Sequence, residues 1–568
     1  MSLILKNGIV YDPRNRMKGE KKDIFIENGK IVEKLNERKA RVIDVANRLV
    51  MPGGVEIHSH IAGGKVNMGR MLRPEDRLKL IMPRTPLTRS GAGFANPTAF
   101  MTGYLYSKMG YTTTFTPAMP PLMAKHTHEE LHDIPMTDKA AYALTDGNWF
   151  IYKYLKEGDI DKCAAYVAWL LKATKGLAIK VVNPGGTEAW GWGKNCTSLD
   201  DPVPNFDITP REIIRGLMEV NERLGLPHSI HLHTTNLGRL GNYVTTLETL
   251  KIPNGTKPAF DRQVMHLTHL QFHCFGGDTW KNFESKADEV VKEVNKRENV
   301  AIDSGNVTLD ETTTMTADGP MEYYLQSLSH LKWVNKNVEM ETAPGVTPFI
   351  YSNKMSSSSI QWAIGLEVEL LVKDPWKIML TTDHPNGGPF FRYPRIIAWL
   401  MSRKYREKTI SEVHKAVQDH TILPTLDREY TLDEIATITR AAPARAFGPL
   451  AETKGHLGVG ADGDVSVYDI DPRAFNPNDY LEIEEKFSKA AYTVKGGEVV
   501  VKDGEIVNVV QGRTLWSSPP VNEALAREVM KDIEYSFKRY YSVNLANYPV
   551  AESYLSGSTP IVTKSKIA

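Results

Sequence analysis

Residues 51–64 read "MPGGVEIHSHIAGG" and place two histidines, His58 and His60, at the end of a short apolar run. Residues two apart leave a strand on the same face, so both imidazoles can reach one metal ion. Two histidines on a strand also occur for purely structural reasons. The fold and the function therefore depend on whether the rest of the chain supplies more strands and more ligands.

The chain from 52 to 447 alternates short apolar runs with amphipathic segments. The apolar runs cover 176–182, 228–233, 263–270, 299–303 and 376–382, and helical patterns cover 209–225, 287–298 and 395–408. Strand–helix alternation over this length indicates a parallel α/β architecture. A (β/α)8 TIM-type barrel fits it, and such barrels carry their catalytic groups at the carboxyl ends of the strands.

Both ends of the chain have a different texture. The segments 3–12 and 23–35 alternate apolar and polar residues, and each contains an Asn-Gly pair that favours a hairpin turn. The same texture returns in 458–471 and 490–510. We therefore expect residues 1–51 and 448–512 to build one small β-sandwich domain, with the barrel at 52–447 and a peripheral tail at 513–568.

Composition excludes several classes of function. The chain has 568 residues and a formal net charge of +1, which gives no bulk attraction to nucleic acid. Its three cysteines include no CxxC pair, which argues against a disulfide framework or a redox cofactor on this chain. No apolar run approaches the roughly 20 residues that membrane insertion needs, and the start lacks a signal-peptide core. A cytoplasmic protein is the expectation.

The ends of the apolar runs carry the side chains with metal chemistry. After His58 and His60 come Lys180, then His231 and His233, then His266 and His269, and finally Asp383. Imidazole nitrogen and carboxylate oxygen are the usual zinc ligands where no thiolate is present. A lysine ammonium has no lone pair, so Lys180 qualifies only if its amine is carboxylated.

These residues in this order resemble the metal-dependent amidohydrolase superfamily, whose barrel is accompanied by a small β domain from both chain ends. The blocks at 56–70, 176–186, 266–277 and 381–402 resemble more closely the family of formylmethanofuran dehydrogenase A subunits. That resemblance covers essentially the whole chain, and the four blocks are much more specific than the HxH pair.

The resemblance implies a site with two Zn²⁺ ions bridged by N6-carboxylysine at Lys180. His58 and His60 would bind one ion, and His231 and His269 the other. Asp383 would contact a metal and act as general acid and base. His233 and His266 stay open as alternative ligands, because strand alternation does not decide either pair. Lys65, just after the first ligands, could attract a small carboxylate.

The resemblance also implies the reaction: zinc-dependent, reversible condensation of formate with methanofuran to formylmethanofuran, the first step of methanogenesis from carbon dioxide. Formate would be made on a partner subunit with a tungsten or molybdenum pterin and iron–sulfur clusters. The alternatives are a component of the bacterial formyltransferase/hydrolase complex, a stand-alone hydrolase of the dihydropyrimidinase or N-acyl-amino-acid deacylase kind, and a metal-free scaffold barrel.

A further histidine cluster, "KHTHEELH" at 125–132, has His128 and His132 at helical spacing. Thr127 and Glu130 match a capping box, so we interpret this segment as a solvated helix start rather than a metal site.

Overall fold

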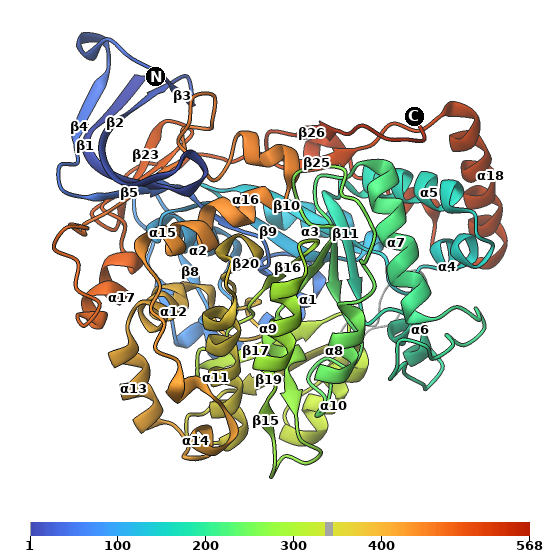
Figure 1. Cartoon of the computed structure of the whole chain (residues 1–568). Coiled ribbons are helices and arrows are strands. Elements are labelled where there is room, and N and C mark those ends of the chain that lie inside the picture. Colours follow the sequence, from blue (N-terminus) through green and yellow to red (C-terminus); the bar gives the residue numbers. More distant parts are fainter. Residues whose placement is uncertain (1, 336–344) are drawn as a thin grey trace.

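The computed structural model of the chain describes residues 2–335 and 345–568. Its central element is a curled sheet of eight parallel strands with helices around it (Figure 1). In the described residues these strands are β6 (Gly54–Glu56), β9 (Tyr111–Met119), β10 (Asp138–Leu144), β11 (Ala178–Val182), β12 (Ile230–His233), β13 (Met265–Leu267), β16 (Val300–Asp303) and β20 (Ile378–Met379). They are neighbours in chain order, which confirms the predicted barrel.

The barrel closes beyond the ends of its first and last strands. Across the part of the chain that the structure describes, β6 and β20 share no strand ladder, but Ser59 and His384 form an isolated parallel bridge. The amide of His60 also donates to the carbonyl of His384 at 2.7 Å. The closure is therefore made by the segments that carry His58, His60 and Asp383.

Helices cover the outside of the barrel. They include α1 (Gly64–Leu72), α2 (Ala99–Lys108), α4 (Trp149–Lys156), α5 (Ile160–Thr174), α6 (Gly186–Gly191), α7 (Pro210–Leu224), α8 (Tyr243–Thr249), α9 (Ala287–Lys296), α11 (Ser356–Leu371), α14 (Ala416–His420), α15 (Leu432–Ala436) and α16 (Ala442–Arg445). The predicted helices at 209–225 and 287–298 are confirmed. Thr209 and Glu212 form a capping box before α7, and Gly225 ends it in the left-handed region.

Two local predictions about helices are wrong. The pattern at 395–408 is two helices, α12 (Tyr393–Met401) and α13 (Arg403–Glu412), because Ser402 is extended and its side chain accepts from the amide of Tyr405. The helix α3 (Ala124–His132) begins before Thr127, so there is no capping box there. His128 is buried, with Nε2 2.9 Å from the carbonyl of Thr174, and is not a solvated residue.

An insertion between β16 and α11 covers the carboxyl ends of the barrel strands. It consists of β17 (Glu311–Thr316), α10 (Gly319–Ser329), β18 (Val334–Asn335) and β19 (Gly345–Ile350), with the three strands antiparallel in the order β17, β19, β18. The sequence analysis did not predict this element. It is called the roof below.

Both chain ends build one sheet, as predicted (Figure 1). Its nine strands are β1 (Ser2–Asp12), β2 (Met17–Glu27), β3 (Lys30–Val32), β4 (Arg41–Asp44), β5 (Leu49–Pro52), β21 (Val465–Tyr468), β22 (Tyr492–Lys495), β23 (Glu498–Lys502) and β24 (Glu505–Ile506). The N-terminal β5 pairs antiparallel with the C-terminal β21, which joins the two halves. Helix α17 (Tyr480–Ser488) lies between β21 and β22 in the chain.

One of the two Asn-Gly predictions holds. Asn28 and Gly29 connect β2 and β3 in a hairpin. Asn7 and Gly8 instead lie inside β1, at a register shift opposite β2. Asn7 has φ of 63°, and its amide donates to the Asp23 carboxylate, so the positive φ here makes a bulge and not a turn.

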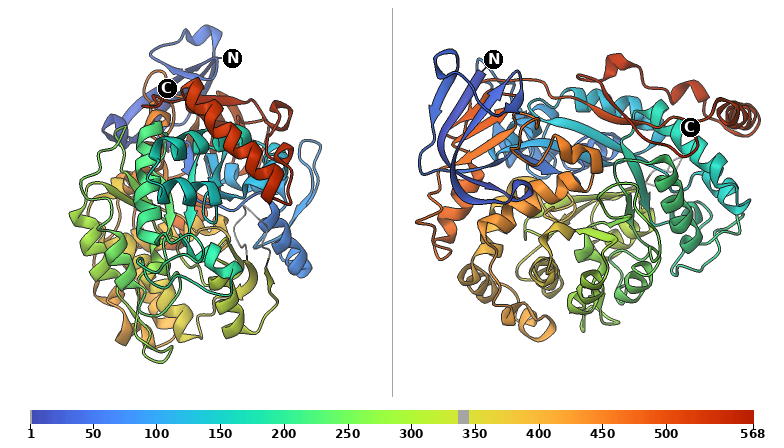
Figure 2. Two further views of the ribbon diagram at one scale, coloured as in Figure 1. Left: turned by 90° about the vertical axis from the view of Figure 1, so that its right-hand side faces the viewer. Right: turned by 45° about the horizontal axis from the view of Figure 1, so that its top comes forward.

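The C-terminal segment packs along the barrel. The strands β25 (Leu515–Ser518) and β26 (Thr559–Val562) pair in parallel, and the long helix α18 (Glu523–Tyr540) packs on α5 (Figure 2). Among the described helices, none has the length and apolar composition to cross a bilayer.

A buried cluster of ion pairs joins the barrel to the small sheet. Asp138, at the start of β10, accepts from Lys454, from Lys495 at 3.0 Å and from Arg513 at 2.8 Å. Asp464 contacts the same two lysines at 2.7 and 2.9 Å. Burial raises the pKa of Asp138, but the surrounding cations outweigh it and hold this pKa well below its usual range.

We predict that Asp138→Asn destabilises the fold by about 3–5 kcal/mol, because it leaves buried cations without their partner. Urea unfolding measures the loss. The native pKa of Asp138 is depressed, so its contribution is present above the unfolded pKa near ~3.9 and is lost as the pH falls below it. Asp200→Asn, which breaks an exposed pair with Arg211, is the control and should cost under about 1 kcal/mol. Equal losses in both variants would contradict the prediction.

Candidate metal centre

The carboxyl ends of the barrel strands meet in one buried chamber. Its floor and walls include the side chains of His58, His60, Lys180, His233, His269 and Asp383. The roof contributes Thr314, Thr316, Met321, Glu322 and, just after β19, Tyr351. The structure thus brings together six of the predicted residues, carried by five different strands or the segments directly after them.

Asp383 lies at the centre of this arrangement. Its Oδ1 is 2.9 Å from Nε2 of His58 and 3.2 Å from Nε2 of His60, and its Oδ2 is 4.0 Å from Nε2 of His269. Burial raises the pKa of Asp383, but the neighbouring histidines outweigh it and hold that pKa well below its usual range. Asp383 and His269 have φ of 48° and 36°, values that non-glycine residues adopt rarely and mainly at functional sites.

Lys180 projects into the chamber from β11. Its side chain is buried, and Nζ has no hydrogen-bond partner. Burial lowers the pKa of Lys180 to about 7, against the opposing effect of Asp383 and Asp303. A neutral amine has the lone pair that carboxylation requires, so the environment fits the modification that the sequence analysis expected.

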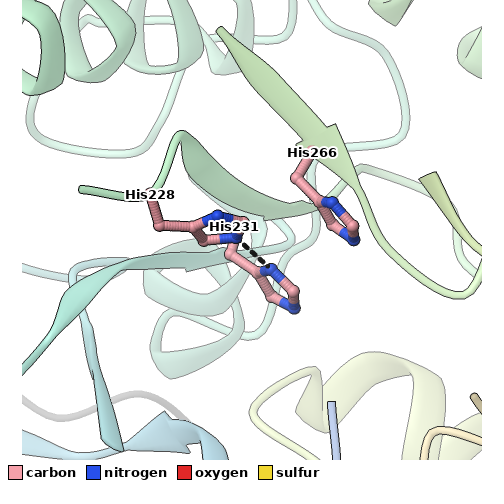
Figure 3. Close-up of side chains that lie close together, drawn as sticks. All are labelled: His228, His231 and His266. Atoms are coloured by element: carbon pink, nitrogen blue, oxygen red, sulfur yellow. Dashed lines mark hydrogen bonds between the residues drawn. The ribbon is translucent and has the colours of Figure 1, made fainter. Parts of the chain in front are cut away.

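His231 and His266 do not line the chamber. They lie beneath it with His228, as Figure 3 shows, and the rings of His231 and His266 stack with centroids 4.7 Å apart. His228 Nε2 is 2.9 Å from His231 Nδ1, and His231 Nε2 is 3.0 Å from His58 Nδ1. Both nitrogens of His231 are therefore engaged by other histidines.

The direction of this histidine chain follows from its far end. His228 Nδ1 lies 2.8 Å from the carbonyl of Ala446, which can only accept, so Nδ1 carries the proton. In the neutral chain His228 Nε2 accepts from His231, and His231 Nε2 accepts from Nδ1 of His58. This order leaves the Nε2 lone pair of His58 facing Asp383 and the chamber, which is the tautomer that a metal ligand needs.

Asp303 supports the site from below, and the sequence analysis missed it. Its Oδ2 is 3.1 Å from His58 Nδ1 and 2.8 Å from His266 Nε2, while its Oδ1 accepts from the amide of His269 at 2.7 Å. The residue ends the apolar run 299–303, so the rule that chemistry lies at run ends would have found it.

His233 is held by the roof. Its Nε2 is 3.1 Å from Oδ2 of Asp318, the residue that caps α10. A proton on Nε2, shared with this carboxylate, leaves the Nδ1 lone pair free for a metal. Lys65 on α1 is buried nearby, with Nζ unpartnered, and burial lowers its pKa to about 8 against the effects of Asp146, Asp383 and Glu322.

The donor set suits a divalent metal such as zinc. Nitrogen and oxygen atoms of His58, His269 and Asp383 lie within 4.8 Å of one another, and all three residues are buried. Imidazole and carboxylate are zinc ligands, and a cation between His58 and Asp383 would take the place of a proton. The acidic group of Asp138, Asp462 and Asp464 is different, because lysines already neutralise it.

A second hollow adjoins the chamber. It is lined mainly by apolar residues, and Phe272, Met321 and Tyr351 line both spaces. The remaining apolar lining comes from Phe275, Trp280, Leu325, Leu328, Leu331, Phe349, Ile350 and Met355.

Comparison with known proteins agrees with this geometry. Residues 41–501 match the model of the amidohydrolase family. The chain is 58% identical over 559 residues to protein FwdA of Methanocaldococcus jannaschii, covering 98% of this chain and 97% of that protein. It is 35% identical over 501 residues to the first of the Fhc proteins in the formyltransferase/hydrolase complex of Methylorubrum extorquens, covering 87% of each.

A solved structure is similar over the same extent. The crystal structure of the formyltransferase/hydrolase complex FhcABCD from Methylorubrum extorquens, in complex with methylofuran, contains a chain with 32% identity and a TM-score of 0.89. The similarity covers 99% of this chain and 100% of that one.

We predict that Asp303→Asn lowers zinc affinity about 10- to 100-fold, because Asp303 fixes the ring of His58 and the backbone of His269. Competition with a chelator of known affinity measures the change. Asp310→Asn is the control, since Asp310 pairs with Arg392 and is not among the residues lining the chamber. Unchanged affinity in Asp303→Asn, with the fold retained by circular dichroism, would refute the supporting role.

Proposed function

This chain belongs to the amidohydrolase family and, within it, to the family of formylmethanofuran dehydrogenase A subunits, and on that premise we propose that it condenses formate with methanofuran, reversibly and with zinc. The observation that carries the proposal is the unpartnered Lys180 amine among histidines and Asp383 in one buried chamber. An amine so placed fits a carboxylated bridge between two metals.

We propose His58, His60, carboxylated Lys180, His233, His269 and Asp383 as the ligands of two zinc ions. His233 takes the place that the sequence analysis gave to His231, because His231 has both nitrogens engaged and lies outside the chamber. His266 is likewise a supporting residue, bonded to Asp303. Two zinc ions bound to this set would activate a water molecule and polarise the substrate carbonyl.

The protein groups then handle protons and position the substrate. Asp383 accepts a proton at its carboxylate and returns it to the amine nitrogen when the formamide is hydrolysed. The same group reverses these transfers in the condensation. Lys65 attracts the carboxylate of formate, and the roof excludes bulk water from the chamber, which strengthens each of these interactions.

We propose that the chain works in a complex in the cytoplasm. The relative from Methylorubrum extorquens is by its name one component of a complex, and the structure of that complex holds methylofuran. Formate would reach this chain from a partner subunit with a tungsten or molybdenum pterin and iron–sulfur clusters. The cysteines Cys163, Cys196 and Cys274 are buried free thiols, consistent with redox chemistry on the partner.

The second candidate is the corresponding component of a formyltransferase/hydrolase complex, which the TM-score of 0.89 to FhcABCD favours. The chemistry in the chamber would be the same, in the hydrolytic direction. Purification from the native source separates the two: a pterin-containing partner supports the first, and a formyltransferase partner supports the second.

We predict that the wild-type chain contains two zinc ions and a mass increment of about 44 Da on Lys180, and that it hydrolyses formylmethanofuran. Lys180→Ala should lose the increment, the zinc and at least about 1000-fold in rate, because the bridge is gone. Metal analysis, native mass spectrometry and a hydrolysis assay check each part. Lys194→Ala, at an exposed position, is the control. A metal-free wild type, from cells supplied with zinc and carbon dioxide, would mean that the chain is a scaffold.

We predict that His233→Ala and His231→Ala behave differently. His233→Ala should retain about one zinc ion at saturation, because a ligand is lost. His231→Ala should retain two with affinity about 10- to 100-fold weaker, because only the ring of His58 loses support. Zinc stoichiometry at saturating metal measures the difference, and the reverse pattern would restore His231 as the ligand.

A further inference from the structure

A buried carboxyl that the reaction described above does not use faces the chamber. Glu322 lies in the first turn of α10, is 1% exposed and lines the chamber together with Lys180 and Asp383. Gly345 of β19 leaves room for it, since a Cβ there would come within 2.4 Å of the Cβ of Glu322. The roof is thus built to hold this side chain over the candidate metal centre.

One oxygen of Glu322 is fixed by Thr314. The Thr314 hydroxyl lies 2.8 Å from Oε2 of Glu322 and 2.8 Å from the carbonyl of Thr347. A hydroxyl has one proton, and a carbonyl can only accept. When Thr314 donates to Thr347, its contact with Glu322 needs a proton on the carboxyl, so this pocket accommodates the neutral acid.

The other oxygen, Oε1, is buried without a hydrogen-bond partner. Burial, with Asp318 and Asp383 nearby, raises the pKa of Glu322 well above its usual range, against Thr314 and Lys65. A buried acceptor without a partner is costly, and it persists where a ligand supplies the missing donor. A cation beside Oε1 would favour the ionised carboxylate.

We propose that Glu322 is the residue that binds the amine end of the substrate, pairing its carboxylate with the ammonium group and then taking one proton from it. This inference rests on the proposed function and adds the group that recognises the primary amine. Lys65 and Glu322 then provide opposite charges for the two substrates, formate and the amine.

The protons balance in both directions. The carboxyl of Glu322 releases its proton to solvent as the ammonium enters, and the ammonium then transfers one proton to the carboxylate, which leaves a free amine lone pair for the new C–N bond. Condensation of the amine with formate expels one hydroxide, and the proton on Glu322 converts it to water. In hydrolysis the C–N bond breaks, and the proton returns to the amine.

The test compares binding of methanofuran, the amine, with binding of formylmethanofuran, the neutral formamide, to the zinc-loaded full-length protein by calorimetry. In Glu322→Gln the amide can keep the contact with Thr314 but cannot carry a negative charge. We expect the Kd for methanofuran to rise about 10-fold or more, and the Kd for formylmethanofuran to change less than about 3-fold.

The control is Glu367→Gln. Glu367 is a buried carboxyl on α11 whose pKa burial also raises, to about 7, but it bonds to the amides of Ile422 and Leu423 and is not among the residues lining the chamber. It should change neither Kd. An unchanged Kd for methanofuran in Glu322→Gln, or equal losses for both ligands, overturns the inference while the proposed function stands. A wild type that binds and hydrolyses neither ligand refutes both.

Discussion

The closure of the barrel between Ser59 and His384 is the constraint on which the site depends. A ring of parallel strands is stable only when its first and last members meet, and here they meet in the segments that present His58, His60 and Asp383. Three of the proposed ligands therefore hold their positions because the barrel is closed. A metal ion that bridged these two segments would in turn stabilise the closure, so that metal binding and barrel stability are linked.

Below the chamber, the protein keeps histidines in defined tautomers by burying them in a directed chain. Burial lowers the pKa of His228 and His231 well below the usual range, so both rings are neutral and each has one donor and one acceptor nitrogen. The carbonyl of Ala446 sets the direction at one end, and Asp303 accepts at the other. A water-filled floor would impose no such order, because each ring would exchange tautomers freely.

Much of the architecture could be predicted because it follows from periodicity and from residues at run ends. The eight strands, the sheet from both chain ends and most site residues were found this way. The choice between His231 and His233 could not be, since it depends on which ring another histidine engages in three dimensions. The roof was missed because its threonine-rich strand resembles any edge strand. Asp303 was within reach of the run-end rule, whereas the break at Ser402 depends on packing.

The pairing of β5 with β21 also determines when the chain can finish folding. More than 400 residues separate Pro52 from its partner Val465. At a synthesis rate of about 5–20 residues per second, the strands of the N-terminus wait roughly 20–80 seconds on the ribosome for their neighbours. During that time β5 presents an open edge of unpaired backbone groups, so a chaperone that shields extended strands would serve the nascent chain of this protein before its barrel exists.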